Sequence, residues 1–194
     1  MFNEAFINSG VMDELLTQTV RMADFDPNGV VTPKERITAI AFLADFWELK
    51  PDRIEDNQEV AQAILTVFKR GCRDRMRLLR AVSFEMMFKL LHHFSINRNQ
   101  FAPIIYKSLT FLLIEFHMHV EIREQLMRRF QALFQEVQTI PVAILCEPLL
   151  KQIAISGPLT ADFNIFDFEF FGVVANHKRA TVNIGLQIID TMVN

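Results

Sequence analysis

The chain has 194 residues, of which 51% are hydrophobic and 22% are charged, and this composition excludes a disordered chain. Its formal net charge of −3 gives no general attraction to polyanions, so we expect no nucleic-acid partner. The most apolar stretch, residues 104–116, is broken by Lys107 and Glu115. It is shorter than the roughly 20 residues that a membrane span needs, so no span is expected.

Apolar residues recur at helical spacing along almost the whole chain, and strand-like alternation appears only in one phenylalanine-rich segment. Helix start and stop signals bound the segments: Thr32-Pro33 opens one helix, Lys50-Pro51 ends it, and Gly71 ends the next. The predicted fold class is therefore all-α. In chain order, the predicted helices cover about residues 11–23, 33–49, 57–71, 73–94, 105–116, 120–137, 141–153, 160–175 and 177–193.

Several helix starts resemble one another, because charged residues that include an arginine precede a run of apolar and small residues. From Arg36 to Arg77 the interval is 41 residues, and from Arg77 to Arg123 it is 46. Both intervals fall in the ~40–47-residue period of two-helix repeats. The last interval, from Arg123 to Arg179, is longer at 56 residues.

On these helix starts and this period, residues 33–194 resemble HEAT/armadillo-type helical repeat proteins. The resemblance implies a right-handed α-solenoid of about four antiparallel helix pairs over residues 32–194, with a binding surface on its inner helices. Residues 1–31 are expected to form an extra N-terminal helix and a turn packed on this array. An irregular helical bundle is the alternative. The last predicted helix reaches Asn194 without a stop signal, as in a piece of a longer array.

The turn between the first two predicted helices resembles an EF-hand calcium loop. Calcium needs about six to eight oxygen ligands, and the spacing of this loop supplies them in order, with Gly29 at the sharp turn. The candidate ligands are Asp24, Asp26, Asn28, the Val30 carbonyl, Thr32 and Glu35. In the alternative interpretation, the segment is an ordinary turn in which Glu35 closes a capping box with Thr32. We find no second loop to complete the usual EF-hand pair.

Basic residues are concentrated between Lys69 and Arg80. Within a helix predicted from about Arg73, the residues Arg73, Arg77 and Arg80 are spaced i, i+4 and i+7 and would line one face. Together with Arg70 they are candidates for binding an acidic or phosphorylated segment of a partner protein. The alternative is a solvated face neutralised by nearby carboxylates, of which Asp74 is the nearest in sequence.

The phenylalanine-rich segment, residues 163–171, fits a strand by alternation, but its flanks favour a helix. A helix would bury Phe163, Phe166 and Phe170 on one stripe and leave Phe168 on another face. We therefore predict Phe168 as a further partner contact.

No motif for nucleophilic, metal-assisted or phosphoryl-transfer catalysis occurs, so we expect no enzyme. The expected function is a non-enzymatic scaffold for protein–protein interaction, and the alternative is a calcium-binding helical module. Cys72 and Cys146 form no motif and are interpreted as free thiols. Since no signal peptide opens the chain, a cytoplasmic location is expected.

Overall fold

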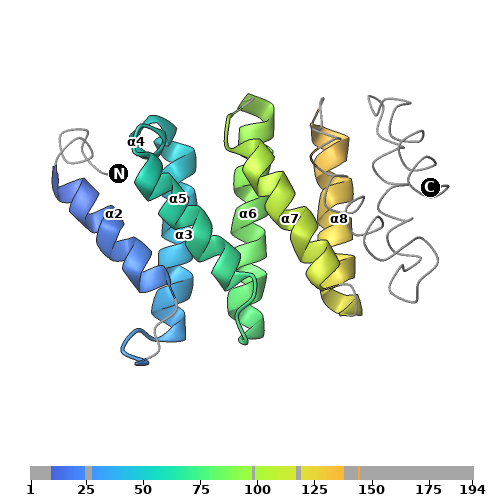
Figure 1. Ribbon diagram of the computed structural model, residues 1–194, viewed down its shortest axis with the longest axis horizontal. Coiled ribbons are helices and arrows are strands. Elements are labelled where there is room, and N and C mark those ends of the chain that lie inside the picture. The colour runs from blue at the N-terminus through green and yellow to red at the C-terminus, as the bar shows by residue number, and fades with distance from the viewer. Residues whose placement is uncertain (1–9, 25–27, 98, 117–118, 138–143, 145–194) are drawn as a thin grey trace, which may run out of the picture. The chain divides into compact units, whose positions relative to one another are not determined.

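The computed structural model describes residues 10–24, 28–97, 99–116, 119–137 and 144, and the regular structure in these ranges is entirely helical. The all-α prediction is thus confirmed for this part of the chain (Figure 1). Apart from residue 144, the predicted helices 141–153, 160–175 and 177–193 lie outside these ranges. The chain divides into two compact units, residues 1–90 and 91–194.

The first unit contains α2 (Gly10–Ala23), α3 (Pro33–Leu49), α4 (Pro51–Glu55), α5 (Gln58–Gly71) and the first part of α6 (Arg77–Asn97). Both α2 and α5 pack against α3 (Figure 1). Helix α2 buries Met12, Leu16, Thr19 and Ala23, whose spacing places them on one face. That face meets a core in which Ile40 and Trp47 are fully buried.

The ends of these helices follow their local chemistry. Thr32 caps the N-terminus of α3. Asn57 caps the N-terminus of α5, and the Asn57 side-chain oxygen accepts a hydrogen bond from the backbone N–H of Val60 at 3.2 Å. Lys50 ends α3 as predicted, but the short helix α4 then begins at Pro51, where the sequence predicted no helix. Proline tolerates the first helical position because the N–H that it lacks has no partner there.

Helix α6 begins at Arg77, four residues later than predicted. The residues before Arg77 form a turn that the Asp74 side chain stabilises. One Asp74 carboxylate oxygen accepts a hydrogen bond from the Met76 N–H at 2.9 Å, and the other accepts from Arg36 Nη1 at 2.9 Å. The partner on α3 lies 38 residues earlier in the chain. A local periodicity cannot reveal such a contact.

The second unit contains the remainder of α6, α7 (Ala102–Glu115) and α8 (Val120–Glu136). Tyr106 on α7 is buried and its hydroxyl shares a 3.0 Å hydrogen bond with Ser95 Oγ on α6. Phe130 of α8 is fully buried, and His92 of α6 pairs with Glu136 at the end of α8. Among the described helices, none combines the length and the apolar character that crossing a lipid bilayer requires.

Candidate functional site

The end of α5, its connection to α6 and the start of α6 carry the densest positive charge in the described part of the chain. Residues 69–80 include six basic residues and one acidic residue. We call this segment the basic turn, and its basic members are Lys69, Arg70, Arg73, Arg75, Arg77 and Arg80.

The four predicted arginines occupy different local structures. Arg70 lies in the last turn of α5, Arg73 lies in the connection and donates to the Lys69 carbonyl at 3.0 Å, and Arg77 is the first residue of α6. Arg80 is half-buried and donates to the carbonyls of Asp74 and Arg75 at 2.8 and 2.9 Å. The prediction that Arg73, Arg77 and Arg80 line one helical face is therefore wrong, because α6 begins after Arg73.

The exposed members of the basic turn are Arg70, Arg73, Arg75 and Arg77. Arg80 instead ties the turn to the start of α6 through its two backbone contacts. Arg75 belongs to the basic run between Lys69 and Arg80 but was not predicted as a site residue, because it falls off the predicted helical face. Its exposure follows from the turn that replaces the first predicted turn of helix.

Asp74, the carboxylate nearest in sequence to the exposed arginines, forms its ion pair with α3. Its carboxylate binds Arg36, and the two side chains are only 11% and 9% exposed. Within the basic turn, Arg70 pairs with Asp24, whereas the Lys69 ammonium lies close to the Arg73 guanidinium. The pKa of Lys69 is lowered, first by its burial and then by repulsion from the Arg73 guanidinium.

Several of the EF-hand-like residues have partners of their own. Glu35 Oε2 accepts from the backbone N–H and from the hydroxyl of Thr32, both at 2.7 Å, and the Glu35 N–H donates to Thr32 Oγ1 at 3.3 Å. These bonds form the capping box that the alternative interpretation predicted. They also lower the pKa of Glu35, because they favour its ionised form.

At the other end of the same loop, Asp24 forms a 2.6 Å ion pair with Arg70 Nη1. Gly29 has a φ of +69°, in the left-handed region that favours glycine. Asn28 and Val30 are exposed, and Asp26 lies outside the described residues, as does Phe168. Among the residues that the structure does describe, no group of three His, Cys, Asp or Glu side chains is placed to hold a metal ion.

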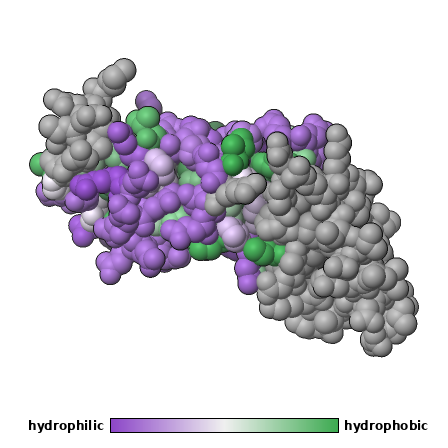
Figure 2. Space-filling model, turned by 90° about the horizontal axis from the view of Figure 1, so that it is seen from above, coloured by the Kyte–Doolittle hydropathy of each residue, from purple (hydrophilic) through white to green (hydrophobic). Residues whose placement is uncertain are grey.

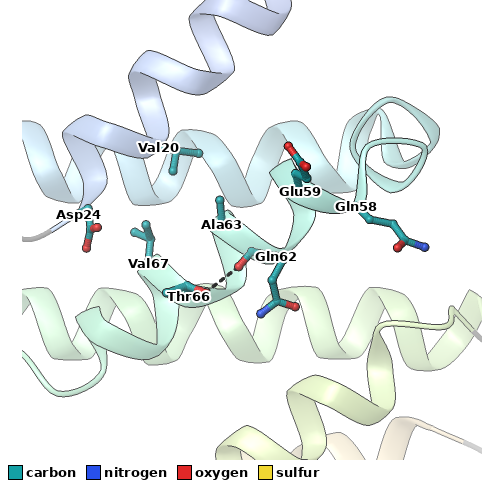
Figure 3. Close-up of a pocket in the computed structure, with 8 residues that line it drawn as sticks. All are labelled: Val20, Asp24, Gln58, Glu59, Gln62, Ala63, Thr66 and Val67. Carbon is teal, nitrogen blue, oxygen red and sulfur yellow. Dashed lines mark hydrogen bonds between the residues drawn. The ribbon is translucent and has the colours of Figure 1, made fainter.

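A groove between α2 and α5, with a volume of about 510 Å³, was not predicted (Figure 3). Apolar side chains and polar ones share its lining, and Asp24 lies at the opposite end from Gln58 and Glu59 (Figure 3). The groove depends on two helices that are separated by α3 and α4, so the sequence carries no local signal for it. Its lining residues are Val20, Asp24, Gln58, Glu59, Gln62, Ala63, Thr66 and Val67.

Figure 2 shows the molecule from above the view of Figure 1. The coloured surface is mainly hydrophilic there, and its hydrophobic residues form small separate patches. Scattered exposed apolar residues of this kind are normal for a folded protein. On the described part of this face, hydropathy therefore indicates no extended docking surface.

Comparison of the chain with known proteins identifies no relative. The chain matches no protein-family model, no curated protein and no solved structure.

Proposed function

We propose that this chain is a non-enzymatic scaffold whose basic turn binds an acidic or phosphorylated segment of a partner protein. The observation that supports the proposal is the concentration of exposed arginines on the basic turn, in which Arg70 pairs with Asp24 and the one acidic residue, Asp74, pairs with Arg36. Guanidinium groups suit carboxylates and phosphates because their planar set of N–H donors matches two oxygens at once.

The position of the arginines relative to the helix dipoles supports an anionic ligand. Arg70 and Arg73 lie near the C-terminal end of α5, where positive charge stabilises the helix. Arg75 and Arg77 lie at the N-terminal end of α6, which has no acidic residue in its first turn. Positive charge at that end is unfavourable for the helix itself, whereas a bound anion would interact favourably with both the arginines and the dipole.

The proposal is tested by reversing one exposed charge at the basic turn. The probe is a fluorescent glutamate-rich peptide, with a phosphoserine peptide as a second ligand, and the readout is the Kd from fluorescence anisotropy. We expect Arg77→Glu to raise the Kd by about tenfold, and we expect added salt to weaken the binding of the native chain because exposed charges are screened.

Arg128→Glu on α8 is the matched control, because Arg128 is an arginine with a 72% exposed side chain outside the basic turn. It makes the same change in net charge and should leave the Kd close to the native value. Equal effects of the two variants would show only a general charge effect and would overturn the proposal. So would a failure of the native chain to bind either peptide.

Calcium binding by residues 24–35 is a second candidate function, favoured by the left-handed conformation of Gly29 at the position where an EF-hand loop turns sharply. Glu35 would then exchange its contacts with Thr32 for the cation. Unfolding temperatures in millimolar calcium and in chelator test this, because a ligand that binds only the folded state raises its stability.

Glu35→Gln separates the two roles of that residue. Glutamine can still form a capping box, but it cannot supply the bidentate carboxylate that a calcium loop uses. A calcium-dependent rise in unfolding temperature that is lost in Glu35→Gln supports the calcium function. An unchanged unfolding temperature in the native chain contradicts it.

A further inference from the structure

Two apolar side chains are exposed among the arginines of the basic turn. Met76 is 40% exposed and Leu78 is 61% exposed, and they alternate along the chain with Arg75 and Arg77. The next residue, Leu79, is fully buried. A single exposed leucine is unremarkable, but here two large apolar groups lie beside two exposed guanidinium groups.

The backbone that presents these side chains is held in place by several hydrogen bonds. The Asp74 N–H donates to the Gly71 carbonyl at 3.1 Å, and the Met76 N–H donates to Asp74 Oδ1 at 2.9 Å. Arg80 Nη1 then binds the carbonyls of Asp74 and Arg75. A ligand that docks here therefore loses less affinity to the ordering of the turn than it would on a flexible loop.

We propose that the partner segment bound by the basic turn is acidic and also carries apolar side chains, which pack on Met76 and Leu78. This inference rests on the proposed function and narrows its ligand. The acidic groups pair with Arg75 and Arg77, and the apolar groups remove Met76 and Leu78 from water. Methionine adapts its shape easily to a partner, whereas a wholly polar phosphorylated tail would leave both side chains exposed.

An anionic lipid surface also attracts basic and apolar residues, but the exposed face of α6 favours a peptide. Ala81 and Glu85 follow Leu78 at i+3 and i+7, so they lie on the same side of the helix, and both are exposed. An interfacial membrane helix needs an apolar face that is continuous over several turns. On α6 this face reaches an acidic residue within two turns.

The test compares two peptides of equal charge, one made of glutamate and leucine and the other of glutamate and serine. We expect the native chain to bind the leucine peptide about tenfold more tightly, since apolar burial on Met76 and Leu78 contributes only with that peptide. The double variant Met76→Ser/Leu78→Ser should lose this preference and keep its affinity for the serine peptide. The single variant Met76→Ser, which changes no helical residue, should reduce the preference if the double variant proves unstable.

The outcomes separate this inference from the function on which it rests. If the two peptides bind equally well and Arg77→Glu weakens both, the apolar contact is wrong and the anion-binding function stands. If neither peptide binds, or Arg77→Glu changes nothing, the proposed function itself fails. Vesicles of equimolar phosphatidylcholine and phosphatidylserine provide the third arm, and sedimentation with them that depends on Met76 and Leu78 would overturn the inference in favour of lipid.

Discussion

Replacing Asp74 by alanine should be among the most damaging single changes in the first unit. The Asp74 carboxylate joins Arg36 of α3 to the turn before α6 by a 2.9 Å ion pair, and it also accepts from the Met76 N–H. The variant Asp74→Ala would leave the Arg36 guanidinium, whose side chain is 9% exposed, without this counter-charge. It would also remove the cap of the turn.

The expected loss of stability follows from the burial of the pair. Removing one partner of a buried ion pair costs about 3–5 kcal/mol, because the remaining charge is poorly solvated. Asp74 and Arg36 are 11% and 9% exposed, so we expect the lower end of this range, about 3 kcal/mol. Asp74→Asn keeps an acceptor for Met76 and should cost less, by about 1 kcal/mol for the retained hydrogen bond.

Urea unfolding followed by circular dichroism measures these losses as free energies of unfolding. Asp45→Ala is the matched control, because Asp45 pairs with Lys89 at 2.6 Å but has a 64% exposed side chain, and exposed pairs contribute about 1 kcal/mol or less. Arg36→Met added to Asp74→Ala should restore part of the lost stability, since the buried guanidinium that lost its partner is then removed as well. Equal losses for Asp74→Ala and Asp45→Ala would refute the reasoning.

Three further predictions concern local contacts. Because the pKa of Glu35 is lowered from its ordinary value of 4.5, the ionised carboxylate stabilises the fold above about pH 4.5, and this contribution is lost as the pH falls through the folded-state pKa. The difference in free energy of unfolding between the native chain and Glu35→Gln should therefore shrink as the pH falls through that range. A difference that does not change with pH contradicts the prediction. A Cβ at Gly71 would lie 2.2 Å from Ser83 Oγ, so Gly71→Ala should lower the free energy of unfolding in urea by about 1–3 kcal/mol. Adding Ser83→Ala to Gly71→Ala should relieve most of that loss. If the losses of the two single variants simply add in the double variant, the clash is not its cause. Burial raises the pKa of Tyr106 to about 12, so the unfolded chain ionises this hydroxyl more easily and the fold loses stability as the pH rises above 10. Because the chain has one tyrosine, ultraviolet titration measures the ionisation of this residue alone. A titration midpoint near pH 10 in the folded chain refutes the prediction.

The sequence predicted the helices best where local chemistry determines their ends. The capping box of Thr32 and Glu35, the cap at Asn57 and the stop at Gly71 are all short-range features, and all are present. Helix α4 was missed because Pro51 was interpreted only as a stop signal. Proline occupies the first turn at the start of both α3 and α4, so the same residue type can end one helix and open the next.

The candidate site was less predictable because its geometry depends on distant contacts. Arg36 binds Asp74 from 38 residues away, and this contact accompanies the late start of α6 and the separation of Arg73 from the helical face. Arg80 matched the helical spacing of an exposed stripe, but its guanidinium binds backbone carbonyls instead. Charge density was visible in the sequence, whereas the direction of each side chain was not.

The ion pair between Asp24 and Arg70 couples the two candidate sites, although they are 46 residues apart in sequence. If both proposed sites bind their ligands, a cation at the loop would compete with Arg70 for the Asp24 carboxylate, and an anion at the basic turn would compete with Asp24 for Arg70. Each ligand therefore removes a competitor of the other. By thermodynamic linkage, any factor by which a loop cation tightens the binding of an acidic segment is also the factor by which that segment tightens the binding of the cation.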